Sequence, residues 1–328
     1  MRIAILGAGH WHVPMYLDHL AAIPDVEIIA LADPSEEARE AALSKMAGAR
    51  AYADYRVLLD REEVDLCFAH APHDEMTALA ADLVDRGQPF HMEKPLGLDW
   101  RALAVVAEKA RHQGLFISVP LVSRYFGVVS RLLELRREGR LGEPVYFSFR
   151  LFAGPPQRYL EMHVPWMLDP AKAGEGPLFN FGPHATDLFL ALTGLQPQRV
   201  YGWSSHALYR IAIPDLVGYV IEADNGCQGL CEVSYTAARG YERYFSLSTT
   251  TLDYGGSVEA GRIRLRDGSE LAAEGMGSDE AYGAYTRDVL RRFAAGEQPI
   301  AGIDDMVAVL RVLNAVQRSL AERAVVEV

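Results

Sequence analysis

Short apolar runs alternate with longer segments of helical composition over roughly the first 120 residues. This pattern predicts strands at 2–6, 27–32, 64–69, 89–92 and 115–119, and helices at 11–22, 35–46, 74–86 and 100–112. Apolar strands separated by helices are typical of a parallel sheet covered on both faces. Ser35 is placed to cap the second helix, because its hydroxyl can accept from a backbone N–H of the first turn.

The pattern changes after residue 122. Extended segments are expected at 145–152, 199–204, 217–223, 229–234, 243–248 and 262–266, and helices at 126–137, 186–192, 279–295 and 304–324. A stretch rich in Pro and Gly, 154–177, is expected to be a long ordered loop. We therefore predict an α/β domain with a parallel sheet over 1–122. An open, mostly antiparallel sheet domain should follow over 123–328. Its last helix could pack against the first domain.

Composition and charge exclude several classes of function. Half of the 328 residues are hydrophobic, and 44 acidic against 32 basic residues give a net charge of −12. An acidic surface repels a phosphate backbone, so nucleic-acid binding is not expected. The chain shows neither a secretory signal nor an apolar run of membrane-spanning length, so we expect a cytoplasmic protein without a membrane partner. Three cysteines, Cys67, Cys227 and Cys231, are too few for a disulfide framework and fit core positions.

A glycine turn directly follows the first strand. Gly7 permits a tight turn, and Gly9 lets the backbone approach a pyrophosphate at the N-terminus of the next helix. His12 occupies the place where a third small residue is usual, and it should widen the contact between helix and strand. The turn and the strand–helix–strand context together predict a dinucleotide-binding site.

Asp33 ends the second strand, 24 residues after Gly9 (33 − 9). A carboxylate there is placed to bind the adenosine ribose and would repel a 2′-phosphate, so NAD is favoured over NADP. Ser35 and Arg39 lie close enough in sequence to leave NADP open.

Two later motifs carry a resemblance. Glu93-Lys94-Pro95 follows a strand, and residues 176–187 read Gly-Pro-Leu-Phe-Asn-Phe-Gly-Pro-His-Ala-Thr-Asp. Together with the glycine turn, Asp33, Pro72, Gly87 and the segment 299–319, they resemble the glucose–fructose oxidoreductase and inositol dehydrogenase family (Gfo/Idh/MocA) over essentially the whole chain. The resemblance implies a Rossmann domain joined to an open sheet, with the active site between them.

The resemblance also implies an NAD(P)-dependent dehydrogenase acting on a secondary hydroxyl or carbonyl of a sugar, polyol or related small molecule. Lys94 would hydrogen-bond the reacting oxygen, His184 would be the general base, and Asn180 would orient the substrate. Many relatives have Asp at the position of Asn180, and Asn and His at those of His73 and Met76. Gly176-Pro177 also replaces part of a glycine run, so the substrate stays open.

The expected site residues fall into two groups. The cofactor is expected to contact Gly7, Ala8, Gly9, His10, Trp11, Asp33, Pro34, Ala71, Pro72, His73, Glu93 and Lys94. The substrate is expected to contact Arg124, His163, Trp166, Asn180 and His184. An ordinary surface arginine is nearly as good an interpretation of Arg124, and loop packing is an equal alternative for His163 and Trp166. Asp187 could hydrogen-bond His184 or cap the helix.

Several alternatives remain at this point. His10, His12, His70 and His73 follow strands whose ends share one sheet edge, so a metal site with His184 is conceivable; we favour polar residues lining a nicotinamide pocket and expect no metal. A non-catalytic dinucleotide-binding sensor or scaffold is a second functional hypothesis, and a redox-assisted lyase or hydrolase a third. A sheet packed on one face makes a homo-oligomer, dimer or tetramer, the expected assembly.

Overall fold

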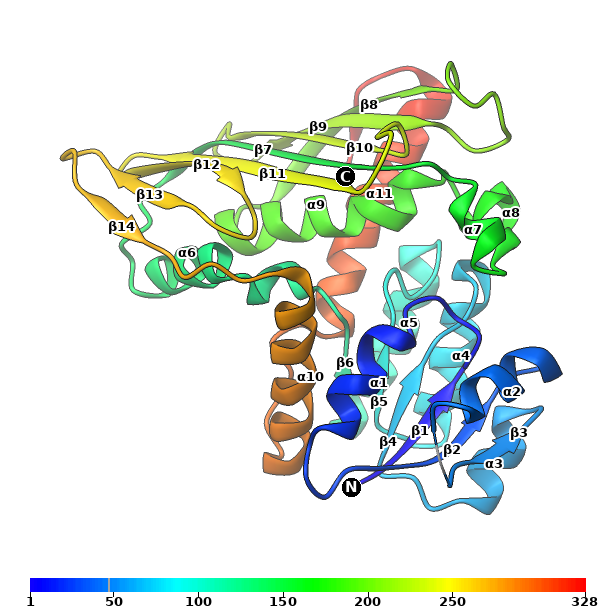
Figure 1. The fold of residues 1–328 in the computed structure, drawn as a ribbon. Coiled ribbons are helices and arrows are strands. Elements are labelled where there is room, and N and C mark those ends of the chain that lie inside the picture. Colours follow the sequence, from blue (N-terminus) through cyan, green and yellow to red (C-terminus); the bar gives the residue numbers. More distant parts are fainter. Residues whose placement is uncertain (47) are drawn as a thin grey trace.

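The computed structural model describes residues 1–46 and 48–328, and its two sheets lie in separate lobes (Figure 1). The first sheet is entirely parallel, with strand order β3-β2-β1-β4-β5-β6, which confirms the expected α/β class. Its strands are β1 (Arg2–Leu6), β2 (Glu27–Ala32), β3 (Arg50–Tyr52), β4 (Leu66–Ala69), β5 (Phe90–Met92) and β6 (Ile117–Ser118). Its helices are α1 (Pro14–Ala21), α2 (Glu36–Leu43), α3 (Tyr55–Arg61), α4 (His73–Asp85) and α5 (Trp100–Gln113).

Local signals explain most of these boundaries. The hydroxyl of Ser35 accepts from the backbone N–H of Ala38 at 3.2 Å, which confirms the predicted cap of α2. The first helix begins at Pro14 and not at residue 11, because the residues before it form turns that continue the glycine loop. Strand β3 and helix α3 were not predicted. β3 is three residues long and lies at the sheet edge, where no apolar run marks it.

The second sheet has nine strands in the order β14-β13-β12-β11-β7-β10-β9-β8-β15. All neighbouring pairs are antiparallel except β7 and β10, so the expected open, mostly antiparallel sheet is confirmed. The strands are β7 (Pro144–Ala153), β8 (Pro197–Ser205), β9 (Leu216–Ala223), β10 (Gln228–Ser234), β11 (Tyr241–Thr249), β12 (Leu252–Ser257), β13 (Arg262–Leu265), β14 (Glu270–Ala272) and β15 (Val326–Glu327).

Helix α9 (Pro177–Thr193) runs along one face of this sheet and packs on β7 and β10 (Figure 1). The helix predicted at 186–192 is part of this longer helix, although Gly182 and Pro183 usually break a helix. The break does not occur: fourteen of its residues are buried, and a Cβ on Gly182 would lie 3.0 Å from Leu313 of the last helix. Burial of the helix outweighs the roughly 3 kcal/mol that an interior proline costs.

The segment 154–177, predicted as an ordered loop, contains three short helices. They are α7 (Arg158–Glu161), η2 (Pro165–Leu168) and α8 (Pro170–Ala173). Each is only four residues long, so no helical periodicity could reveal it. These short helices project from the sheet lobe toward the first lobe (Figure 1).

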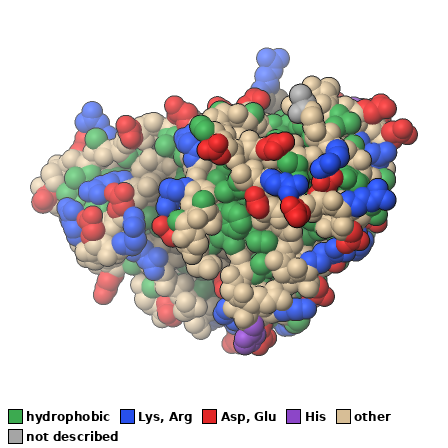
Figure 2. Space-filling view, turned by 90° about the horizontal axis from the view of Figure 1, so that it is seen from below, with side chains coloured by type: hydrophobic (Ala, Val, Ile, Leu, Met, Phe, Trp, Pro, Cys, Tyr) green, Lys and Arg blue, Asp and Glu red, His purple; other side chains and the backbone are tan. Residues whose placement is uncertain are grey.

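The two last long helices contact both lobes. α10 (Ser278–Ala295) packs against α1, and α11 (Ile303–Glu322) packs against α5, α9 and β8. Figure 2 shows the molecule from below the view of Figure 1, and acidic and basic side chains are interspersed over that face. In the described part of the chain, no helix combines the length and apolar character needed to cross a bilayer.

The segment between the lobes is fixed by an ion-pair cluster. Arg124, in η1 (Val122–Tyr125) ahead of α6 (Gly127–Arg137), donates to Asp187 of α9 at 2.6 Å, to Asp305 of α11 at 2.7 Å and to the carbonyl of Ile300 at 2.8 Å. The Arg124 side chain is 10% exposed and that of Asp187 is 1% exposed. Arg124 is therefore engaged away from the cleft, and the expectation that it binds substrate is not supported. Asp187 neither caps the helix nor pairs with His184.

Asp187→Ala is expected to lower the free energy of unfolding by about 3–5 kcal/mol, because it leaves a buried guanidinium without its main partner. Urea denaturation followed by circular dichroism measures this. Glu222→Ala removes a partner from the more exposed pair with Arg199 and should lower the free energy of unfolding far less, because solvent screens that pair. Equal losses in the two variants would contradict a special role of the buried cluster.

Candidate active site

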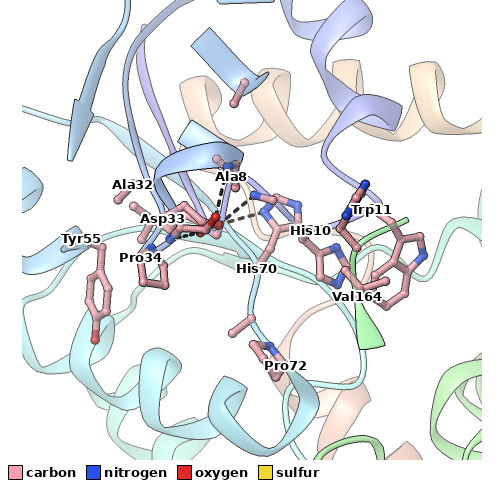
Figure 3. Close-up of a pocket in the computed structure, with 18 of the residues that line it drawn as sticks. Ala8, His10, Trp11, Ala32, Asp33, Pro34, Tyr55, His70, Pro72 and Val164 are labelled. Carbon is pink, nitrogen blue, oxygen red and sulfur yellow. Dashed lines mark hydrogen bonds between the residues drawn. The ribbon is translucent and has the colours of Figure 1, made fainter. Parts of the chain in front are cut away.

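A cavity of about 1340 Å³ opens at the carboxyl edge of the parallel sheet (Figure 3). It is lined by most of the residues that we expected to contact the cofactor: Gly7, Ala8, Gly9, His10, Trp11, Asp33, Pro34, Ala71 and Pro72. His163 and Trp166, expected at the substrate, line the same cavity from the second lobe. The cavity therefore lies between the lobes, as the resemblance implies.

The glycine turn leaves room only for backbone. Gly7 has φ +71°, and a Cβ there would lie 2.1 Å from the carbonyl oxygen of His70. A Cβ on Gly9 would lie 2.9 Å from Cβ of Ala38. A side chain at either position would clash, so the turn keeps its backbone close to the space where a pyrophosphate fits.

Asp33 sits at one end of this cavity, beside Pro34 and Tyr55, whereas His10, Trp11 and Val164 lie at the other (Figure 3). Its carboxylate accepts from the backbone N–H of Gly9 and of Ser35, each at 2.9 Å. A carboxylate has about four lone-pair positions, so Asp33 retains acceptor capacity for ribose hydroxyls.

Aromatic rings from both lobes meet at the opposite end. His10 stacks on Trp11 with ring centroids 3.9 Å apart, and Trp11 lies 5.4 Å from Trp166 and 5.7 Å from Tyr159. Among the described residues, the Nε2 atoms of His10 and His70 are buried without a hydrogen-bond partner. Unpaired buried nitrogens beside an aromatic surface fit a ligand that brings polar atoms and a flat ring, as a dinucleotide does.

Three expected cofactor residues, His73, Glu93 and Lys94, do not line the cavity. His73 is fully buried, and its ring lies 5.0 Å from that of Trp166. Glu93 is also fully buried, accepts a hydrogen bond from Tyr16, and lies 3.0 Å from Nδ1 of His12. Burial alone would raise the pKa of Glu93, but His12 and the neighbouring Lys94 hold it well below its ordinary value. Glu93 is therefore a buried anion whose charge favours the protonated form of Lys94.

Lys94 reaches across to the second lobe. Its Nζ donates to the backbone carbonyl and to Oδ1 of Asn180, both at 2.9 Å. Asn180 in turn donates from Nδ2 to the hydroxyls of Tyr159 at 2.6 Å and Tyr235 at 3.2 Å. Its amide is thus oriented at both ends, with the oxygen toward Lys94.

Burial lowers the pKa of Lys94 to about 8, with Glu93 opposing the shift and Arg158 adding to it. The ammonium is therefore present below about pH 8 and is progressively lost above it. A lysine poised this close to neutrality can donate to an oxygen and still exchange its proton.

His184 lies four residues after Asn180 on α9, so both side chains share one face of the helix. It is half-buried, and its Nδ1 is a buried atom without a partner in the described part of the chain. Burial, Lys94 and Arg243 together hold the pKa of His184 well below its ordinary value. The imidazole is neutral at pH 7 and available as a base.

Three further histidines of the cluster, His10, His70 and His73, are neutral at pH 7. Burial is the main cause that lowers the pKa of His10 well below its ordinary value, of His70 to about 4 and of His73 to about 3. Across residues 1–46 and 48–328, no three His, Cys, Asp or Glu side chains are arranged to hold a metal ion.

Two family profiles match the two halves of this chain. The oxidoreductase family with an NAD-binding Rossmann fold matches residues 1–121, and the GFO/IDH/MocA C-terminal domain matches residues 129–252. The chain belongs to the Gfo/Idh/MocA family. Its cofactor is accordingly NAD or NADP, and it is an NAD(P)-dependent oxidoreductase.

Individual relatives match over most of the chain. Inositol 2-dehydrogenase of Streptomyces avermitilis is 28% identical over 307 residues, covering 90% of this chain and 80% of that protein. D-xylose 1-dehydrogenase (NADP(+)) 2 of Haloferax volcanii is 25% identical and covers 100% of this chain and 99% of its own.

Solved structures support the same fold. Levoglucosan dehydrogenase, in complex with NADH and levoglucosan, matches with a TM-score of 0.88 at 17% identity, covering 100% of this chain and 99% of that one. GenD2 from gentamicin A biosynthesis, in complex with NAD, matches with a TM-score of 0.85 at 22% identity, covering 100% and 96%.

Sequence reasoning missed several residues of the site. Tyr159 was considered as a substrate contact, with loop packing as an equal alternative, but its hydrogen bond to Asn180 was not predicted. Tyr235, the residue after β10, also orients Asn180 and was missed because it lies far from any motif. Tyr16 and His12 hold Glu93; only the unusual histidine in the glycine turn gave a signal. Contacts between segments so distant in sequence have no local pattern.

Asn180→Asp is expected to raise the pKa of Lys94 from about 8 by about one to three units, because a carboxylate would replace the amide oxygen 2.9 Å from Nζ. The chain has four lysines, so NMR of protein labelled with ¹³Cε-lysine can follow each titration. Lys94→Met assigns the resonance, and the resonance of Lys109 should not move. An unchanged Lys94 titration in the variant would contradict this contact.

Proposed function

We propose that this chain transfers hydride between a nicotinamide and a secondary hydroxyl or carbonyl carbon of a sugar, polyol or related small molecule. The contact of Lys94 Nζ with Asn180, one helical turn from His184, carries the proposal. It brings together a hydrogen-bond donor, an orienting amide and a neutral base; none of the three lines the cofactor cavity, but Tyr159, which accepts from Asn180, packs against Trp11 on its wall.

When bound, the cofactor supplies the hydride acceptor or donor. We propose that it is held by the backbone at Gly7–Gly9 and by Asp33, with its nicotinamide near His10 and Trp11. Lys94 then donates a hydrogen bond to the substrate oxygen and stabilises negative charge on it. His184 accepts the hydroxyl proton as the alcohol is oxidised and returns it in the reverse direction. Asn180 fixes the position of Lys94 and of the substrate.

We propose NAD as the preferred cofactor. The negative charge of Asp33 at the adenosine end would repel a 2′-phosphate. Arg39 does not offset this, because its guanidinium donates to the backbone carbonyls of Asp33 and Pro34 at 2.8 and 3.1 Å.

Asp33→Ser is expected to weaken NADH binding and strengthen NADPH binding, changing the ratio of the two dissociation constants about tenfold or more, because it removes both a ribose acceptor and a like charge. Titration of nicotinamide fluorescence measures both constants. Asp54→Ser, which removes another carboxylate lining the cavity, is the control and should leave the ratio near its original value. Tighter binding of NADPH than NADH by the unaltered protein would refute the preference.

We further propose a homo-oligomer located in the cytoplasm. The sheet face away from α9 exposes Tyr146 on β7, Tyr244 on the neighbouring β11, and Tyr201 farther along the same face on β8. A second copy of the same chain would cover this face symmetrically.

Lys94→Met and His184→Gln are each expected to lower kcat for a substrate found in a panel of sugars and polyols by about 10²–10⁴-fold, because each removes a group that handles the proton or the charge on oxygen. Absorbance of NADH measures turnover, and nicotinamide fluorescence should show that NADH still binds. Lys109→Met removes a surface lysine paired with Asp85 and should leave kcat unchanged.

Undiminished turnover by the Lys94 variant would refute the assignment. NADH binding without turnover of any panel member would favour the sensor or scaffold. Product formation without net change in NADH would indicate the redox-assisted lyase or hydrolase.

A further inference from the structure

Two arginines of the sheet lobe lie near Lys94 and His184, yet neither forms an ion pair with any carboxylate in the described part of the chain. Arg158 begins α7, and Arg243 lies on β11. Neither lines the cofactor cavity. Other arginines of this acidic chain, such as Arg124, Arg199 and Arg292, do pair with Asp or Glu. Arginines without an ion pair elsewhere, such as Arg137 and Arg239, are exposed to solvent, whereas Arg158 and Arg243 are half-buried.

Arg158 is connected to the catalytic network by hydrogen bonds. It donates to the hydroxyl of Tyr159 at 3.0 Å, and the same hydroxyl accepts from Asn180, which holds Lys94. Its other contact is the carbonyl of Gly154 at 2.8 Å. The guanidinium lies 4.9 Å from the ring centre of Tyr159 and 5.2 Å from that of Tyr241. Aromatic rings and a carbonyl stabilise this cation, but none carries a compensating charge.

Arg243 lies two residues after Tyr241, so both side chains leave β11 on the same face. Its guanidinium is 5.3 Å from the ring centre of Phe126, and its Nε is a buried atom without a hydrogen-bond partner within residues 1–46 and 48–328. Burial lowers the pKa of Arg243, and Glu259, which is exposed and accepts from Ser278, only partly opposes this. Arg243 also contributes to the lowered pKa of His184, so its charge acts on the proposed base.

Three cationic groups therefore act on the proposed reaction site: Lys94, Arg158, which is linked to it through Tyr159 and Asn180, and Arg243. Glu93 is the buried acid nearby, and it already accepts from Tyr16 and faces His12. Asn180, between Lys94 and Tyr159, brings no charge. Arg243 is half-buried, and its buried Nε–H is unfavourable without an acceptor; an anionic ligand gives the strongest such bond.

We propose that the substrate carries a negatively charged group, a carboxylate or a phosphate, which Arg243 and Arg158 bind while the reacting carbon faces Lys94 and His184. The substrate class is then a sugar acid, a sugar phosphate or a nucleotide-linked sugar. This inference rests on the proposed dehydrogenase function and narrows its substrates. The phosphates of the cofactor are not the anion in question, because they belong at Gly7–Gly9 in the other lobe.

The test compares matched substrates with NAD and the full-length protein. D-glucuronate and D-gluconate represent carboxylates, glucose 6-phosphate and UDP-glucose represent phosphates, and D-glucose and myo-inositol are neutral. We expect kcat/KM for members of one anionic group to exceed that of the neutral compounds by about tenfold or more, because a charge-assisted bond to arginine is lost in the latter. The two anionic arms show whether carboxylate or phosphate is recognised.

Arg243→Gln should raise KM for the preferred anion about 10- to 100-fold with a smaller change in kcat, and Arg243→Lys should restore part of the loss. Arg150→Gln removes an exposed arginine of β7 that faces away from the site, and it should leave KM unchanged. Binding of NADH, measured by fluorescence, should be the same in all three variants. Thermal denaturation identifies a variant that fails to fold, in which case Arg243→Lys and Arg158→Gln carry the test.

Turnover of neutral sugars with equal or better kcat/KM than every anionic compound would overturn the inference and leave the dehydrogenase function standing. The same holds if Arg243→Gln raises KM for neutral and anionic compounds alike. Absence of NADH binding would instead contradict the proposed function itself.

Discussion

The hydrogen bonds of Lys94 to Asn180 join the two lobes at the place where chemistry is proposed. Lys94 comes from the turn after β5 and Asn180 from the first half of α9, 86 residues later. Both partners are buried, so neither can be satisfied by water, and each fixes the other. The position of α9 on the sheet thereby decides where the lysine points. Glu93 strengthens the arrangement from behind, because its charge helps a buried ammonium to persist.

Much of the architecture could be predicted from the order of apolar segments. The parallel sheet, the antiparallel sheet and the glycine turn all follow from short-range patterns. The cofactor cavity could be predicted too, since Gly7, Gly9 and Asp33 follow strands whose ends share one edge. Helix α9 was harder, because Gly182 and Pro183 are helix breakers in isolation. Only the tertiary contact with Leu313 explains why a glycine is accommodated inside a continuous helix.

Roles that depend on distant partners could not be predicted. The resemblance implied that Arg124 contacts the substrate, whereas its partners are Asp187 and Asp305 on two later helices. The same limitation hid Tyr235 and the contact of Tyr159 with Asn180. A polar side chain shows its function through the groups that satisfy it, and those groups are distributed over the whole chain. Charge balance around a residue becomes visible only once the fold brings distant segments together.

Helices α10 and α11 have a consequence for how the lobes can move. The chain leaves the first lobe at η1, returns to it with α10 against α1, and passes it again with α11 against α5. A pair of bodies linked by one strand of polypeptide can swing in any direction, whereas one linked by several crossings can only rotate about the line that these crossings define. Any opening of the cleft is thus confined to a narrow arc. When the cleft closes, Lys94 of the first lobe and Asn180 of the second therefore return to the same relative position.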